Sequence, residues 1–414
     1  MPTLQGAALI VLTVLLIQPR GVPDPFGVGA PLAWTVLCLV ATVPALVETM
    51  RGGLPSTRLD PFVWLYVACF LIVFPFSLGR YTSAVWVLSL IANVLVYYAA
   101  LRTTREAPAF IGAILLTIVI GVAVLQIIAV DFHLEQGLLT RIADYDRPQG
   151  WSGYPELGFL VCVQLAILIA IARTATRAAP RLAVSLVMII GVVELVFLFS
   201  RMAWVTAGVL FGVGAVVGRP MPRMWKPALG ALLLVAAIGV AIAQTATGRS
   251  LMNAWTGPNP SAGRLDIWKR TAQMIADHPL AGVGVGNFQA IFEPVYNPYL
   301  NEDMRRGGHA HNLWLQQAAE SGVVVAAVYV ILWVAVVVFA AQRSSGSWID
   351  KAALLVVVAF GVRSMGDFMF FATGGAQGRL HTLMWLVWGV IAGHTAVRRT
   401  ALAVPAATVQ AVSA

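Results

Sequence analysis

Residues 109–130 read AFIGAILLTIVIGVAVLQIIAV, a run of 22 residues without a charged side chain. A helix of this length crosses the roughly 30 Å hydrocarbon core of a bilayer, and its backbone polar groups satisfy one another inside the helix. Buried helices of soluble proteins rarely need so long an uninterrupted apolar stretch. The run therefore predicts a transmembrane helix, and it sets the fold class of the chain.

The rest of the chain repeats this pattern. Hydrophobic residues make up 59% of the 414 residues and charged residues only 11%, whereas soluble domains carry about 25% charged residues. We predict an all-α, polytopic membrane helical bundle of about 12 transmembrane helices. The predicted segments are 4–17, 30–49, 61–78, 82–100, 109–130, 154–172, 182–199, 202–217, 227–246, 313–341, 351–371 and 380–396.

Basic residues in the loops predict the orientation. With the N-terminus in the cytoplasm, every cytoplasmic connection carries at least two basic residues, such as Arg102 and Arg105, and the short outer loops carry few. The net charge of +9 is spread over these loops with no run of Lys or Arg, which excludes a nucleic-acid-binding protein. Three cysteines lie in apolar runs at no metal-binding spacing.

This orientation divides the chain into six regions. Helices 1–5 occupy residues 1–130, a first outer loop 131–153, helices 6–9 residues 154–247, a second outer loop 248–312, helices 10–12 residues 313–399, and a cytoplasmic tail 400–414. The second outer loop, between helices 9 and 10, is predicted to be mostly helical and to lie outside the cytoplasm. We expect it to carry the functional residues, because it is the one substantial water-facing segment.

An amphipathic helix is predicted over residues 262–277 of this loop. Its predicted apolar face suits the membrane surface and holds Leu265, Trp268, Ala272 and Ile275. Arg264 lands beside that face, where a guanidinium either reaches lipid headgroups or looks into a cleft. The glycine-rich residues 282–286 follow this helix and a proline rather than a strand, which favours a flexible turn over a phosphate-binding loop.

Two histidines, His309 and His311, stand directly before the span at 313–341. They lack the partners of a recognised metal motif, so an acid–base role is favoured over metal binding. For one of the two, the alternative is a histidine at the membrane interface that only caps the span. Arg201 lies between two spans with almost no loop, and an intramembrane charge predicts function by default. Arg363 and Asp367, four residues apart on one helix, are predicted to pair.

These residues together resemble the bacterial O-antigen ligase family, with its Wzy-type C-terminal region shared by polysaccharide polymerases. The last motif is His311-Asn312 followed, after nine residues, by Gly322. Val325 stands where the family often has Gly, Thr or Tyr. The other matching stretches are Ser200-Arg201, Gly263-Arg264-Leu265-Asp266-Ile267-Trp268, His278-Pro279-Leu280-Ala281-Gly282-Val283-Gly284 and His309-Ala310.

The resemblance implies a metal-independent membrane glycosyltransferase without a cofactor. Such enzymes move a glycan from an undecaprenyl-pyrophosphate carrier to an acceptor hydroxyl, on a glycan, a lipid A-core or a similar molecule. They are multi-pass proteins of the bacterial inner (plasma) membrane, whose active site faces the periplasm or cell exterior. Membrane lipid is a further partner, and nucleic acid is not.

Roles follow under that chemistry. Arg201 and Arg264 would bind the pyrophosphate oxygens, and His311 would accept the proton of the attacking hydroxyl. Asn312 would orient His311 or contact a sugar, and His309 is the less favoured base. Arg305 and Arg306 would meet anionic groups of the acceptor or of lipid, unless they belong to a solvated loop.

Three other functions stay open. A polymerase of the same family joins two lipid-linked repeat units, and a protein-glycan transferase uses a protein acceptor; the motifs do not separate them. A multi-span transporter or flippase has a similar helix number, but its charges lie near the membrane midplane and often come with internal repeats. Here the notable charges gather at one predicted face, and no repeat is evident.

Overall fold

The computed structural model describes residues 2–17, 31–53, 56–135, 154–198, 200–217, 262–296, 309–366 and 376–402. Within these ranges the secondary structure is helical, with no strand. The predicted all-α polytopic bundle is thereby confirmed. The count of about 12 transmembrane helices stays a prediction, because the segment at 227–246 lies outside the described ranges.

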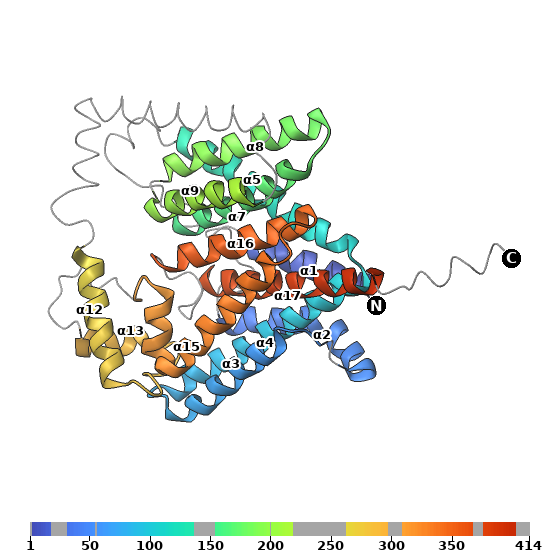
Figure 1. The fold of residues 1–414 in the computed structure, drawn as a ribbon. Helices are drawn as coiled ribbons and strands as arrows, with labels where there is room; N and C mark the ends of the chain where they lie inside the picture. The colour runs from blue at the N-terminus through green and yellow to red at the C-terminus, as the bar shows by residue number, and fades with distance from the viewer. Residues whose placement is uncertain are drawn as a thin grey trace, which may run out of the picture.

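Each predicted apolar segment inside the described ranges falls on a helix (Figure 1). The segment predicted at 351–371 ends earlier than expected, because its helix stops at Ser364. The elements are α1 (Pro2–Ile17), α2 (Pro31–Gly52), α3 (Asp60–Val73), η1 (Phe74–Phe76), α4 (Arg80–Glu106), α5 (Ala109–Glu135), α7 (Tyr154–Thr174), α8 (Ala178–Phe197), α9 (Arg201–Val216), α12 (Ala262–Asp277), α13 (Phe288–Ile291), η2 (Phe292–Tyr296), α15 (Leu313–Ala341), α16 (Trp348–Ser364) and α17 (Ala376–Leu402).

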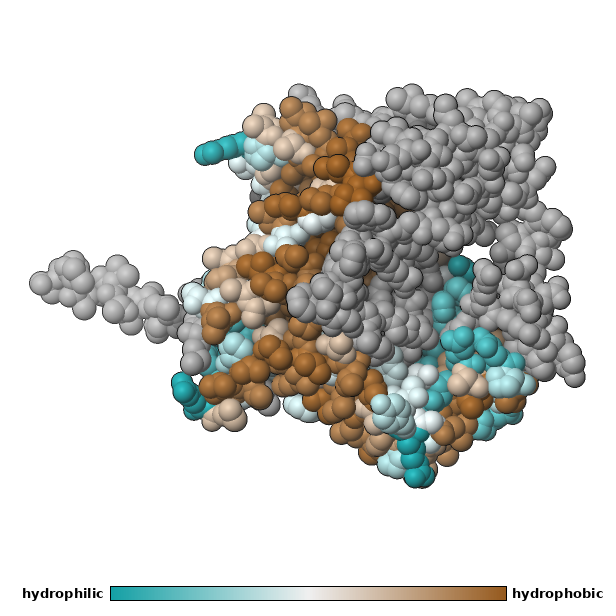
Figure 2. Space-filling model, turned by 180° about the vertical axis from the view of Figure 1, so that it is seen from behind, coloured by the Kyte–Doolittle hydropathy of each residue, from teal (hydrophilic) through white to brown (hydrophobic). Residues whose placement is uncertain are grey.

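The outer surface of the helices is apolar. Six described helices are long and apolar enough to cross a membrane, namely those at Leu32–Arg51, Arg80–Glu106, Ala109–Ile128, Leu157–Thr174, Ala178–Leu195 and Leu313–Ala341. Large side chains such as Leu116, Ile120 and Ile127 are exposed on them, and Figure 2 shows the resulting hydrophobic surface. So large an apolar surface matches lipid rather than water, and the protein is membrane-embedded.

Helix α16 lies at the centre of the bundle. It packs against α7, α9, α15 and α17, and Leu355, Val357 and Phe360 on it are almost fully buried. A helix that is apolar all round is expected to be enclosed by other helices. Several helices therefore surround α16 and lie close enough to contact its C-terminal end.

Helices α12 and α13 lie at the end of the bundle opposite the start of α1 (Figure 1). They share a small hydrophobic core of their own with the start of α15. The buried face of α12 carries Ile267, Thr271 and Met274. This buried face overlaps the predicted apolar face only in part: Trp268 and Ile275 pack against the core, whereas Leu265 is 50% exposed and Ala272 is also exposed. The reason is that α12 packs on protein, so its buried face is set by that core rather than by a membrane surface.

Helix α15 is broken at Gly322, where the backbone leaves helical geometry with φ 84°. The predicted single span over 313–341 is therefore a short helix followed by a longer one. The glycine-rich residues 282–286 supply partners for the carbonyl groups that the break releases. The backbone hydrogen bonds across the break are Val283 N to Ala319 O (2.9 Å), Gly284 N to Glu320 O (2.8 Å) and Val323 N to Pro279 O (2.8 Å).

These bonds decide between the two interpretations of residues 282–286. The N–H groups of Val283 and Gly284 are used inside the fold, so they do not form a phosphate-binding loop. Residues 282–286 form a turn, as expected, but the turn is fixed against α15. The segment thus locks α12 and α13 onto the broken start of α15.

We expect Gly322→Ala to destabilise the protein. Gly322 has φ 84° and ψ 164°, a region essentially reserved for glycine, where another residue costs about 1–3 kcal/mol. A Cβ at this position would also overlap the carbonyl of Leu280. Thermal unfolding in detergent should show a lower midpoint for this variant. Gly208→Ala is the matched control, because a Cβ on Gly208 meets no atom within 4 Å. Equal midpoints for the two variants would contradict the prediction.

Candidate active site

The start of α9 lies against the last turn of α16 and the residues that follow it, which we call the 363–366 turn. Arg363 donates a hydrogen bond from Nη1 to Oγ of Ser200 at 3.0 Å. A Cβ on Gly366 would overlap the side chain of Met202, so the first turn of α9 packs on Gly366. The backbone of Arg201, between these two contacts, is therefore held at the 363–366 turn. Its side chain lies outside the described part of the structure.

The starts of α12 and α15 reach the same turn. Arg264, the third residue of α12, donates from Nη1 to the carbonyl of Gly366 at 2.7 Å. Asn312, directly before α15, donates from Nδ2 to the carbonyl of Met365 at 3.2 Å. These donors complement the partial negative charge at the C-terminus of α16. Arg264 thus turns toward the bundle rather than toward lipid headgroups.

Asn312 also begins α15. Its Oδ1 accepts hydrogen bonds from the backbone N–H groups of Trp314 at 3.0 Å and Leu315 at 3.2 Å. Two donors of a helix start are satisfied in this way. Both ends of the amide are engaged with the fold, which favours the predicted orienting role of Asn312 over a contact with sugar.

His311 has an unusual backbone conformation. Its φ is +49°, and among the described residues no other non-glycine residue has a positive φ. The ring of His309 lies 4.2 Å from that of His311, centroid to centroid, and both residues are half-buried. A residue held in this region costs about 1–3 kcal/mol, and such residues gather at functional sites.

The residue between the two histidines is held from both sides. The N–H of Ala310 donates to Oε1 of Gln316 at 2.7 Å, and its carbonyl accepts from Nε1 of Trp268 at 2.8 Å. Ala310 is fully buried in the small core under α12. Residues 309–312 are consequently fixed between α12 and α15.

The far end of α12 is tied down by polar contacts. Tyr296 donates from its hydroxyl to Oδ2 of Asp277 at 2.7 Å. Burial, followed by the hydrogen bond and the charge of Asp277, raises the pKa of Tyr296 to about 12. The phenol therefore stays protonated near neutral pH and keeps donating, which holds α12 in place relative to η2.

The arrangement brings three helix N-termini to one place. Helix N-termini carry partial positive charge and unpaired N–H groups, so they favour anions. The guanidinium of Arg264 adds a full positive charge there, with five N–H donors of which Gly366 takes one. His311, which is half-buried, directly precedes Asn312 at the start of α15. Such a place can bind an anionic group next to a proton acceptor.

Other predicted residues are only partly accounted for. Arg305 and Arg306 lie outside the described residues, as does Asp367, the predicted partner of Arg363. Arg363 was not predicted to belong to the site, yet this residue is 1% exposed and contacts Ser200. The charge of Arg363 within a predicted span could have indicated a functional role. The spacing of four residues to Asp367 instead predicted an ion pair within one helix, and the contact with the start of α9 was missed.

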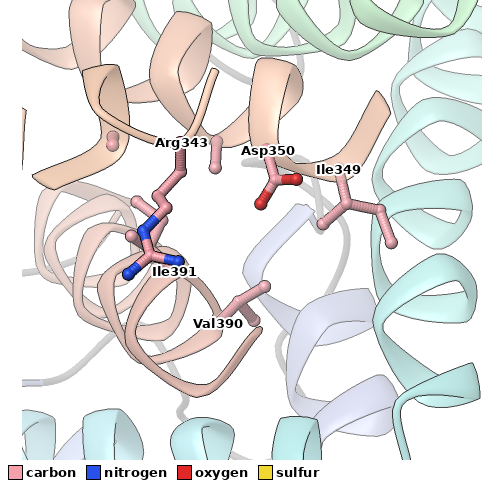
Figure 3. Close-up of a pocket in the computed structure, with 7 residues that line it drawn as sticks. Arg343, Ile349, Asp350, Val390 and Ile391 are labelled. Atoms are coloured by element: carbon pink, nitrogen blue, oxygen red, sulfur yellow. The ribbon is translucent and has the colours of Figure 1, made fainter. Parts of the chain in front are cut away.

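The far end of α16 holds a narrow pocket between α15, α16 and α17, lined by Arg343, Asp350 and Val390 among others (Figure 3). It lies roughly 20 Å along α16 from the 363–366 turn, taking 1.5 Å per helical residue, so it is separate from the candidate site. In the part of the chain that is described, no three His, Cys, Asp or Glu side chains gather as metal ligands would.

Comparison with known proteins agrees with the sequence motifs. Residues 186–330 match the family described as O-Antigen ligase, which confirms the predicted resemblance over about a third of the chain. The matched region contains Arg201, Arg264, His311 and the break at Gly322. The matched region ends at residue 330, before the 363–366 turn. The starts of α9, α12 and α15, which lie inside the matched region, meet at that turn. No curated protein matches the chain.

Proposed function

We propose that this membrane enzyme of the O-antigen ligase type transfers a glycan from an undecaprenyl-pyrophosphate carrier to an acceptor hydroxyl. The proposal rests on one observation, which is the meeting of the starts of α9, α12 and α15 at the 363–366 turn. Each of these starts carries one of the residues singled out in the sequence. Three helix starts that are far apart in the chain thus contact one turn, which supports a shared role of their residues on one substrate.

The pyrophosphate of the carrier would bind to the positive groups of this site. Guanidinium groups bind phosphate oxygens in pairs of parallel hydrogen bonds. We assign this role to Arg264 and Arg201, supported by the helix N-termini on which both stand. As the glycan leaves, negative charge grows on the pyrophosphate, and fixed positive groups stabilise it most in that state.

His311 would act as the general base. The acceptor oxygen attacks the anomeric carbon of the glycan while the bond from that carbon to the pyrophosphate oxygen breaks. The acceptor proton passes to the imidazole, and undecaprenyl pyrophosphate leaves with the bonding electrons. Attack from the face opposite the leaving group inverts the anomeric centre. Asn312 would orient His311, whereas His309, Arg305 and Arg306 would contact the substrates.

The position of the site in the bundle supports transfer at the outer face of a bacterial inner membrane. The loop charges predict a cytoplasmic N-terminus, and α12 lies at the end of the bundle opposite the start of α1 (Figure 1). Polar residues gather at this end in Figure 2. The acceptor and the carrier headgroup would therefore meet in the periplasm or at the cell exterior.

We expect purified protein to transfer glycan from a defined carrier-linked donor to a lipid A-core acceptor, at the same rate with and without EDTA. Guanidinium groups replace a metal ion as the partner of the pyrophosphate in this proposal, which is why chelation should have no effect. The measurement is acceptor labelling by radioactive or fluorescent glycan. Loss of transfer with EDTA, restored by a divalent cation, would contradict the metal-free proposal.

The same assay separates the alternatives. A polymerase would produce a ladder of longer carrier-linked glycans without labelling lipid A-core, and a protein-glycan transferase would label a protein acceptor instead. A transporter would move solute into proteoliposomes and label none of these acceptors. Each outcome replaces the ligase proposal with a named alternative.

A further inference from the structure

The first part of α15 contains two fully buried polar side chains that point to the histidine segment. Gln316 and Glu320 are both 0% exposed, one helical turn apart. Gln316 Nε2 donates to Oε1 of Glu320 at 2.9 Å, and Gln316 Oε1 accepts from the N–H of Ala310. The same Glu320 oxygen accepts from the backbone N–H of Phe288 at 3.3 Å. A chain of hydrogen bonds thus links α13, α15 and residues 309–312.

We propose that this Glu320–Gln316–Ala310 chain positions His311 for proton acceptance, an inference that rests on the proposed function of His311. Gln316 and Glu320 are positioning residues in this proposal, because neither touches the substrates. They act through the backbone of Ala310, which directly precedes His311.

The chain fixes which way the amide of Gln316 points. The Glu320 oxygen already accepts from Phe288, so it favours the NH₂ group of Gln316 on its side. The oxygen of Gln316 is then turned to Ala310, whose N–H needs an acceptor because the residue is buried. Without Glu320, the Gln316 amide is free to flip, which would turn its NH₂ group toward the N–H of Ala310 and leave both donors without an acceptor.

His311 lies between two fixed neighbours. On one side, Gln316 and Trp268 hold the N–H and the carbonyl of Ala310, which fixes both peptide planes of that residue. On the other side, Asn312 caps α15 and bonds to the 363–366 turn. The left-handed φ of His311 is kept by these bonds, since a strained conformation persists only when its surroundings determine it.

A neighbouring glutamine provides a comparison. Gln317 is just as buried as Gln316, but its amide bonds to Ser321 and accepts from Tyr66 on α3. The bond from Tyr66 joins α15 to α3, the bond to Ser321 stays within α15, and neither reaches residues 309–312. Loss of Gln317 should therefore reduce stability alone, whereas loss of Gln316 should also displace the imidazole.

The test compares Gln316→Met with Gln317→Met and Glu320→Leu with Glu320→Gln in the full-length protein. We expect Gln316→Met and Glu320→Leu to lower kcat about 100-fold, because a displacement of about 1 Å at the reacting groups can cost that much. KM for the donor should change little, since the arginines are untouched. Glu320→Gln keeps an acceptor oxygen for Gln316 and should retain most of the activity, and Gln317→Met should lose melting temperature but keep kcat.

A second readout does not depend on activity. The rate at which diethyl pyrocarbonate modifies His311, followed by peptide mass spectrometry, should change in Gln316→Met and stay the same in Gln317→Met. Trp268→Phe removes the other bond to Ala310 and provides a second variant should Gln316→Met not insert. We expect it to change the modification rate of His311 in the same way.

The outcomes separate this inference from the proposed function. If His311→Ala is inactive while Gln316→Met, Glu320→Leu and Trp268→Phe keep normal kcat and normal modification of His311, the positioning inference is wrong and the base assignment stands. If His311→Ala transfers glycan normally, the proposed role of His311 is wrong. Equal losses of kcat in Gln316→Met and Gln317→Met would also overturn the inference, because a purely structural role would then suffice.

Discussion

Replacing His311 by alanine is expected to lower kcat for glycan transfer by about 10²- to 10⁴-fold, the usual contribution of general base catalysis. An acceptor hydroxyl is a poor nucleophile until its proton is taken, and His311 is the half-buried imidazole at the start of α15. The variant should still insert and melt normally, since alanine removes only the side chain beyond Cβ. Transfer by purified protein from a saturating carrier-linked donor is the measurement.

His309→Ala is the matched control for this prediction. The two rings lie side by side, so general damage to the segment should affect both variants, whereas a specific base role affects one. We expect His309→Ala to raise KM, because His309 is assigned a contact with the substrates, and to keep most of kcat, because it is not assigned the proton transfer. Normal transfer by His311→Ala together with loss in His309→Ala would move the base assignment to His309, and normal transfer by both would end it.

The second large effect is expected for Arg264→Lys, which should lower kcat by about 10²- to 10³-fold, as the loss of a fixed hydrogen-bond donor to transition-state charge does elsewhere. Lysine keeps the positive charge but loses the planar pair of donors that binds a phosphate group bidentately. The comparison of kcat between the wild type and this variant measures that loss directly.

Arg264→Lys also separates the proposed role from a structural one. Arg264 bonds to the carbonyl of Gly366 at the end of α16, and this capping contact needs only a cation with one donor. If capping were its whole purpose, lysine would preserve transfer. Arg270→Lys on the same helix is the control, because Arg270 bonds to the carbonyl of Tyr296 away from the 363–366 turn. We expect that control to remain active.

Hydropathy predicted the helices well because a membrane demands long apolar segments that satisfy their own backbone. It failed at the start of α15, where residues 313–341 are apolar enough to read as one span. The break at Gly322 depends on hydrogen bonds from Val283 and Gly284, about forty residues earlier in the sequence. Contacts between distant segments leave no trace in a hydropathy pattern.

The site was predictable in its residue types and less so in its surroundings. A guanidinium beside an apolar face and a histidine before a span are visible along the chain, and the structure brings the segments of both to the 363–366 turn. The positive φ of His311 was not visible, because it results from bonds made by Trp268, Gln316 and Asn312. The buried face of α12 was also missed, since a helix on a protein core buries different residues from one lying on lipid.

The 363–366 turn has a consequence for biosynthesis. Chain synthesis releases Arg201, Arg264 and His311 well before α16 leaves the ribosome, yet the helix starts that carry them are joined through that late segment. A nascent chain that ends near residue 330 would contain every family motif. It would lack the 363–366 turn, to which the helix starts carrying these motifs are bonded. Transfer is therefore expected to begin only once the penultimate described helix has entered the bilayer, so that interrupted translation products do not consume the lipid-linked precursor.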